Sequence, residues 1–214
     1  MKTRFFVSML LLAGLISACN DDDNAGPVDN APRPSEQTTK VIDPTQGGAE
    51  VGSARLTRTD DGVIALFEST AAIPGHTYTL WWVVWNDPAK CQNYPQPCDD
   101  ADFGIADQVK VEVMFASGGI ALADGSIAMS GHLSENDISG SINGLFELPN
   151  FGGLNDAETA EVHLVLRSHG PQIPGQTGAQ ISTYGGGCQV ELPPFAAVPM
   201  AVGECADIQF AVFQ

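Results

Sequence analysis

Apolar residues over most of this 214-residue sequence recur at every second position, which is the spacing of a β-strand with one buried face. Residues 109–115, 161–167 and 207–212 show this alternation. Segments 63–67 and 78–85 are apolar at both parities, which predicts central strands covered on both faces. The sequence has no extended apolar stripe at helical spacing, so we expect little helix.

Glycine and proline punctuate the alternating segments at short intervals. The pair Asp124-Gly125 permits positive φ and predicts a hairpin turn between residues 120–122 and 127–133. Short strands joined by such turns are typical of all-β proteins. We therefore predict a single domain over residues 50–214, an antiparallel β-sandwich, with a closed β-barrel as the alternative.

The N-terminus has the features of a signal peptide. Lys2 and Arg4 provide a positive start, residues 5–16 are apolar, and Ser17-Ala18 supplies the small residues required before cleavage. The apolar run is shorter than the roughly 20 residues that a membrane-spanning helix needs. Residues 1–18 are therefore predicted to be removed during processing.

The end of this segment, Ile16-Ser17-Ala18-Cys19, resembles the lipobox of bacterial lipoproteins. The resemblance implies that Cys19 is lipidated on its sulfur, becomes the mature N-terminus and is acylated there. Several acyl chains together give durable membrane anchoring, at about 0.8 kcal/mol per buried CH₂. An ordinary secretory signal followed by a chance cysteine is the alternative.

Residues 19–49 are rich in Asp, Asn, Pro, Thr and Gly and predict a disordered, acidic tether. The run Asp21-Asp22-Asp23 is similar to the surface-export signal of Bacteroidota-type lipoproteins, which implies a position outside the outer membrane. A soluble linker extended by its own charge fits the same residues and leaves a periplasmic position open.

The chain carries 9 basic and 26 acidic residues, a net charge of −17. This balance argues against nucleic acid as a partner and against a domain that lies flat on an anionic lipid surface. It fits a soluble domain on a tether, or a domain that collects cations.

Four cysteines remain after Cys19, the even number expected in an oxidising compartment. Three pairings are possible. We favour the local disulfides Cys91–Cys98 and Cys188–Cys205, because each pair encloses a proline-containing loop. A zinc site made of all four cysteines is the alternative, although the spacings lack close CxxC pairs.

Histidines and a glutamate form the first candidate metal site. Glu161, His163 and His169 share one parity of a predicted strand, so we expect their side chains on one face. His132 lies on the polar face of another predicted strand. If the two strands are neighbours, these residues can bind zinc or copper. An ordinary polar surface is the alternative.

The loop after Cys98 is a candidate calcium site, with carboxylates at Asp99, Asp100, Asp102 and Asp107. Alternate carboxylates before a glycine resemble the start of a calcium loop, because a hard cation needs several oxygen ligands. The later ligands of that signature are missing from the sequence. A solvent loop tied by a disulfide is the alternative.

Aromatic residues cluster in segment 78–85, where Trp81 and Trp85 share one parity. An outward-facing Trp81 or Trp85 would give a ring platform for the apolar face of a sugar. Large aromatic side chains in a strand covered on both faces are commonly core residues, which is the alternative.

Motifs of common hydrolases are missing from the sequence, which contains neither GxSxG nor HExxH. Lipidation of Cys19 and pairing of the other cysteines would leave no free thiol nucleophile. Carboxylates are abundant, but their abundance does not nominate an acid–base pair. We therefore lean toward a protein without enzymatic activity.

Three fragments, Gly131-His132-Leu133, Val162-His163-Leu164 and His169-Gly170-Pro171, resemble strands of chordin-type CHRD β-domains and of uncharacterised secreted bacterial β-domains. The sequence lacks the paired HxH motif of the CHRD pattern, so the resemblance implies no catalytic residue. It implies an all-β fold.

Three functional hypotheses follow from these features. The leading one is a lipid-anchored envelope protein whose β-domain binds a glycan or an envelope protein. The second is a metal-binding protein or metalloenzyme that uses the histidine cluster. The third is a structural envelope protein without a small-molecule site.

Overall fold

The computed structural model describes residues 33, 35–195 and 200–214. The predicted signal peptide, Cys19 and the acidic run after it lie outside these residues. The described chain is mostly antiparallel β-sheet with little helix, which confirms the predicted fold class. No helix in the described ranges is long and apolar enough to span a membrane.

The strands belong to one nine-stranded sheet. They are β1 (Glu36–Asp43), β2 (Ala49–Thr59), β3 (Gly62–Ser69), β4 (His76–Trp85), β5 (Val111–Ile120), β6 (Ile127–Ser134), β7 (Glu161–Pro171), β8 (Val190–Glu191) and β9 (Glu204–Phe213). Helical segments are short. They are α1 (Ala106–Val109), α2 (Thr177–Gln180) and the 3₁₀ turns η1 (Pro44–Gln46), η2 (Pro88–Lys90), η3 (Asp100–Ile105) and η4 (Asn143–Phe146).

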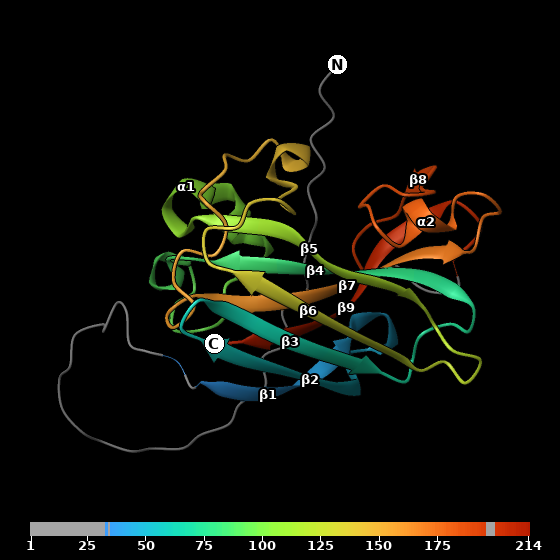
Figure 1. Cartoon of the computed structure of the whole chain (residues 1–214), viewed down its shortest axis with the longest axis horizontal. Coiled ribbons are helices and arrows are strands. Elements are labelled where there is room, and N and C mark those ends of the chain that lie inside the picture. The colour runs from blue at the N-terminus through green and yellow to red at the C-terminus, as the bar shows by residue number, and fades with distance from the viewer. Residues whose placement is uncertain (1–32, 34, 196–199) are drawn as a thin grey trace.

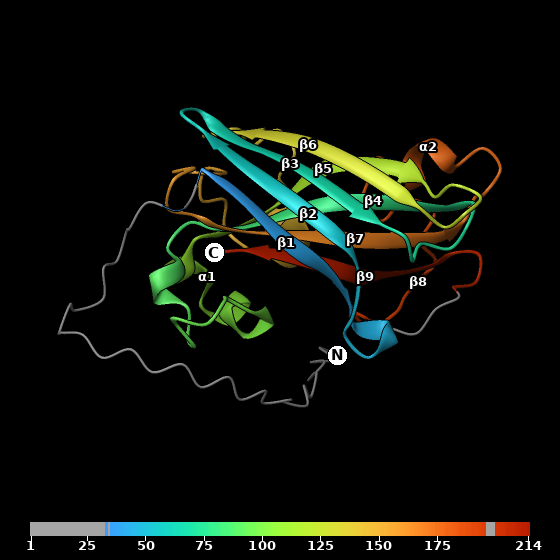
Figure 2. The same cartoon turned by 90° about the horizontal axis from the view of Figure 1, so that it is seen from below.

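The sheet curls into a nearly closed barrel (Figures 1 and 2). Its strand order is β5-β4-β7-β9-β1-β2-β3-β6, and β8 adds in parallel to β9. The end strands β5 and β6 contact each other, but they pair with β4 and β3 respectively. One curved sheet therefore encloses the core, as in the barrel alternative, in place of two stacked sheets.

The predicted Asp124-Gly125 turn forms, with Gly125 at φ 80° and a 2.9 Å hydrogen bond from Leu122 N to Ser126 O. The expected ladder on either side of this turn does not form, because β5 and β6 pair with β4 and β3. The turn lies at the seam of the barrel, where both flanking strands have partners that are distant in sequence.

Strand β1 lies inside the segment predicted to be a tether, so the sheet begins at Glu36 and the expected domain start near residue 50 is wrong. The strand pairs with β2 over its whole length and with β9 on its other side. Val41 is its fully buried apolar residue, while most of its other side chains are polar and partly exposed. A strand with so little apolar surface has the composition of a linker, which explains the error.

Alternate side chains of the strands fill the barrel. Its largest buried residues include Tyr78 and Trp82 of β4, Phe67 of β3, Leu164 of β7 and Phe213 of β9. Complete burial of one such side chain stabilises the fold by about 1.5 to 3 kcal/mol. The expectation that residues 78–85 form a central strand is confirmed, because every residue of β4 is buried.

A β-bulge interrupts the pairing of β7 with β9 next to Arg167. Phe210 and Val212 were expected on the same face as Ile208, but only Ile208 among the three belongs to the barrel core. A bulge adds one residue to a strand and reverses the faces of the positions beyond it. The same bulge pairs Arg167 with Asp207 across the two strands.

A second apolar layer covers the outer faces of β4, β5 and β7. Trp81, Val83 and Trp85 point away from the barrel core and are buried in this layer with Val111 and Val113. Loop residues around η3, α1 and η4 pack against them. Figure 1 shows α1 and α2 on one side of the sheet, toward its two ends.

Candidate functional site

A cavity of about 250 Å³ lies in the apolar layer outside the barrel. Its floor consists of Trp81 and Val83 from β4, Val113 from β5 and Val165 from β7. Strand alternation explains this placement, because the residues of opposite parity, such as Trp82, fill the barrel. Hydrogen-bonded strands therefore hold the floor of the cavity in place.

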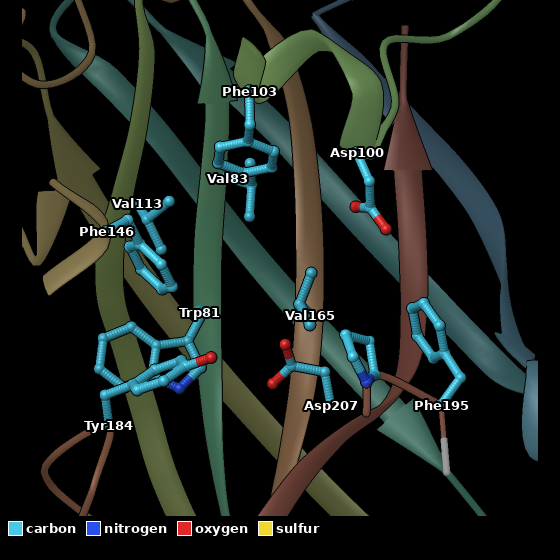
Figure 3. Close-up of a pocket in the computed structure, with 11 residues that line it drawn as sticks. Trp81, Val83, Asp100, Phe103, Val113, Phe146, Val165, Tyr184, Phe195 and Asp207 are labelled. Atoms are coloured by element: carbon cyan, nitrogen blue, oxygen red, sulfur yellow. The ribbon is translucent and has the colours of Figure 1, made fainter. Parts of the chain in front are cut away.

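Aromatic side chains from separate loops form the walls of the cavity (Figure 3). The Tyr184 ring makes edge contacts with Phe146 of η4 and with Trp81, at centroid distances of 5.3 and 5.4 Å. Phe195 lies across the cavity and packs on Phe210, which the bulge in β9 turns outward. The remaining apolar loop residues of the lining are Phe103 and Pro194.

Two carboxylates, Asp100 and Asp207, complete the lining. Figure 3 shows them at opposite ends of the cavity, with Val165 between them. Asp100 is exposed to solvent on one side, but the apolar residues around its carboxyl partly desolvate it and raise its pKa, and the neighbouring charge of Asp99 raises the pKa further. Burial also raises the pKa of Asp207, although Arg167 opposes this shift. None of the described lining residues carries a positive charge.

Arg167 is fully buried beside Asp207. Its Nη1 donates to Asp207 Oδ1 at 3.1 Å, its Nη2 donates to Glu191, and its Nε donates to the backbone oxygen of Tyr184 at 2.9 Å. Burial alone would lower the pKa of Arg167, but the hydrogen bond to Glu191 and the charge of Asp207 raise it above its usual value. The guanidinium therefore stays charged and links β7 to β8, to β9 and to the loop that carries Tyr184.

A hydrogen-bonded chain fixes the Trp81 indole on the cavity floor. Trp81 Nε1 donates to Thr79 Oγ1 at 2.8 Å, and this oxygen lies 2.8 Å from His169 Nε2. Because the Gly186 carbonyl can only accept, His169 Nδ1 carries a proton and donates to it at 2.9 Å, and Nε2 of the neutral ring then accepts from the Thr79 hydroxyl. Burial, and then the charge of Arg167, lower the pKa of His169 to about 4, which keeps the imidazole neutral as this chain requires.

The histidine metal site predicted from the sequence does not assemble. His132 lies on β6, which pairs with β3, whereas Glu161, His163 and His169 lie on β7 between β4 and β9. His163 Nε2 is bonded to Glu161 Oε1 at 2.7 Å, and His169 belongs to the chain that fixes Trp81. The condition of neighbouring strands is not met, so these four residues do not converge on one metal site.

The predicted disulfides Cys91–Cys98 and Cys188–Cys205 are both present. They lie near opposite ends of β7: Cys98 N donates to Glu161 Oε1, and Cys205 Sγ is 3.7 Å from His169 Nδ1. The zinc site of four cysteines is therefore excluded by position. His169 does lie close to Cys188 and Cys205, but their sulfurs are bonded to each other.

The four aspartates proposed for calcium serve different purposes. Asp99 and Asp102 form a capping box at the start of η3, and Asp102 also accepts a 2.8 Å hydrogen bond from Gln92 N. Asp107 is exposed in the first turn of α1, while Asp100 faces the cavity. Within the described residues, these carboxylates do not gather into one group of ligand atoms, so the calcium loop is not formed.

The proposed sugar platform is also corrected by the structure. Trp81 and Trp85 face outward from the barrel, as the platform required, but loops cover them and leave only 2% and 1% of these residues exposed. Trp85 packs against Phe103, with ring centroids 5.1 Å apart. Trp81 also forms part of the cavity floor.

The residues of the aromatic walls, Phe146, Tyr184 and Phe195, were not predicted from the sequence. They lie between the strands, in segments that show no periodicity, and the packing of these segments on the barrel brings them together. Arg167 and Asp207 both belong to alternating segments, so their outward direction was accessible from the sequence. Their mutual contact was not, because it depends on the bulge.

Comparison with known proteins adds no functional assignment: no protein-family model and no curated protein matches this sequence.

Proposed function

We propose that this protein is a lipid-anchored binding protein of the bacterial cell envelope, without enzymatic activity, whose β-barrel carries a small-ligand pocket on its outer face. The aromatic cavity bounded by Trp81, Tyr184, Phe146 and Phe195 is the observation that carries the binding function. Cavities lined by apolar and aromatic side chains with a few placed polar groups are typical of ligand sites. At about 250 Å³ the cavity suits a ligand of small size.

The pocket combines a rigid floor with walls that come from loops. Strand ladders hold Trp81 and Val165, and the disulfide Cys188–Cys205 ties the segment that carries Tyr184 to β9. A floor that needs no rearrangement lowers the entropy cost of binding. These features support a binding site rather than a chance gap in the packing.

Binding can be tested with the purified, oxidised full chain carrying Cys19→Ala, which removes the predicted lipid. A panel of small aromatic cations, alcohols and carboxylates would be screened by calorimetry and by tryptophan fluorescence, since all three tryptophans lie in β4. We expect Phe146→Ala to weaken binding about tenfold, because it removes one ring of the wall.

Leu145→Ala is the matched control, because Leu145 precedes Phe146 in η4, is 66% exposed and does not line the cavity. Its affinity should equal that of the parent protein. The binding proposal fails if no compound of the panel binds, or if Phe146→Ala leaves every affinity unchanged.

The membrane anchor rests on the lipobox resemblance of Ile16-Ser17-Ala18-Cys19. Labelled palmitate should enter the wild-type protein and not Cys19→Ala, and this variant should move from the membrane to the soluble fraction. Asn24→Ala, outside the lipobox, should behave as wild type. Digestion of intact cells with protease would separate a surface position from a periplasmic one. Wild-type protein that takes up no label would contradict the anchor.

A further inference from the structure

The lining of the pocket has an excess of negative charge. Asp100 and Asp207 both contribute to it, and the other described lining residues are uncharged. Asp207 is partly buried, whereas Asp100 is exposed, and the apolar residues beside each carboxylate reduce its hydration and raise its pKa. A carboxylate in such a place gains from any partner that supplies positive charge.

Arg167 balances only part of this charge. Its guanidinium pairs with Asp207 and Glu191 at the same time, so one positive charge faces two negative ones. Asp100 lies at the other end of the cavity and has no ion pair with a basic residue within the described chain. Charge complementarity therefore favours a cation in the cavity and disfavours an anion.

The residues that line the cavity determine which class of cation it can bind. A hard metal ion needs six or more oxygen ligands, whereas this cavity offers two carboxylates separated by Val165 and surrounded by rings. Aromatic faces attract organic ammonium groups, and burial of apolar surface adds to the affinity. Arg167 already stacks on Tyr184 at 3.8 Å, which shows that this ring accepts a cation on its face.

From this geometry we infer that the pocket binds a small organic cation, a protonated or quaternary amine on an apolar body, with its charge at the Asp100 end and its apolar part against Trp81 and Phe146. The inference rests on the proposed binding function and specifies its ligand class. The Asp100 end receives the charge because the Asp207 end already holds Arg167.

The test compares three ligands of nearly equal size: 2-phenylethylamine, 2-phenylethanol and 3-phenylpropanoate. Their affinities for the oxidised full chain with Cys19→Ala would be measured by calorimetry at pH 7. We expect the amine to bind at least about tenfold more tightly than the alcohol, and the carboxylate to bind most weakly. Asp100→Asn should weaken binding of the amine far more than binding of the alcohol, and so remove most of the preference for the amine.

Asp107→Asn is the matched control, because Asp107 lies in α1 directly after η3, is exposed like Asp100 and does not line the cavity. It should keep the full preference for the amine. If the alcohol or the carboxylate binds as tightly as the amine, or if Asp100→Asn keeps the preference, the cation inference is overturned and the binding function stands. If none of the three ligands binds and the compounds of the wider panel that do bind are alcohols or carboxylates, the cation inference alone is overturned. If no compound of the wider panel binds either, both proposals are overturned.

Discussion

The guanidinium of Arg167 stacks on the ring of Tyr184, with 3.8 Å between its central carbon and the ring centroid. The same group pairs with Asp207, which the bulge between β7 and β9 places directly opposite on the neighbouring strand. A single buried cation therefore connects β7, β9 and the loop that forms one wall of the pocket. Substituting Arg167 should therefore lower the free energy of unfolding more than substituting a charged residue on the surface.

We expect Arg167→Met to lower the free energy of unfolding by roughly 3 kcal/mol, because it leaves the partly buried carboxylate of Asp207 without its partner. Urea denaturation of the oxidised protein at pH 7 measures the change. Adding Asp207→Asn should recover part of the loss, since an amide costs less to bury than an unpaired charge.

Lys40→Met provides the control for loss of an ion pair, because the pair of Lys40 with Glu50 is 68% and 54% exposed. It should cost less than about 1 kcal/mol. A double variant Arg167→Met/Asp207→Asn that is no more stable than Arg167→Met would show that the unpaired carboxylate is not the cause.

The buried His169 predicts a dependence of stability on pH. Its folded pKa of about 4 lies below the value of 6.5 for an exposed histidine. Between these values the unfolded chain binds a proton that the folded chain does not, so stability is complete above about pH 6.5 and falls as the pH drops toward 4. The contribution lost over this window is roughly 3 kcal/mol.

Urea denaturation of wild type and His169→Gln at pH 7 and pH 4.5 would measure this contribution. The difference in unfolding free energy between the two proteins should shrink at the lower pH, because only wild type loses the stability that depends on a neutral His169. The raised carboxyl pKa values of Asp100 and Asp207 act in the opposite direction and are common to both proteins. An unchanged difference would mean that His169 does not couple folding to protonation.

The two disulfides should contribute unequally to stability. Cys188 and Cys205 are 17 residues apart and Cys91 and Cys98 are 7 apart, so the first pair constrains the unfolded chain more. Replacing both members of a pair with alanine should cost about 2 to 4 kcal/mol, with the Cys91–Cys98 pair at the low end. Denaturant unfolding of the two double variants compares them directly. A larger loss for the Cys91–Cys98 pair would show that loop closure is not the dominant effect.

The sequence predicted those features that depend on neighbours along the chain. Alternation identified β7 and the doubly covered β4, because the face of a strand residue follows from its position alone. The cysteine pairs were also accessible, since both close short loops. Strand β1 was missed because its place between β2 and β9, rather than its composition, makes it a strand.

Most of the site depends on contacts between distant segments, which local patterns do not report. The bulge beside Arg167 depends on how β9 pairs with β7, and it reversed the expected faces of Phe210 and Val212. The predicted histidine site also depended on a contact between distant segments, and it does not form because the strand order separates His132 on β6 from β7. The alternation of residues along a strand predicts the face on which a side chain lies, whereas the order of the strands in the sheet determines which residues it contacts.

Substitutions at two adjacent glycines of β5 can test how closely the segment that carries Tyr184 packs on the barrel. A Cβ at Gly118 would lie 1.8 Å from the backbone oxygen of Ile181, whereas a Cβ at Gly119 would lie 3.5 Å from the end of the Met129 side chain. Gly118→Ala should therefore push the segment that carries Tyr184 away from the sheet.

We expect Gly118→Ala to cost about 1 to 3 kcal/mol of unfolding free energy through overpacking and to weaken ligand binding in the pocket. Gly119→Ala has ordinary contact distances, so restriction of the unfolded chain should leave stability unchanged or raise it by up to about 1 kcal/mol. Urea denaturation and calorimetric titration of both variants give the comparison. Equal effects of the two substitutions would contradict the close seating of Ile181 on Gly118, and a destabilised Gly118→Ala with unchanged affinity would show that the position of Tyr184 does not control binding.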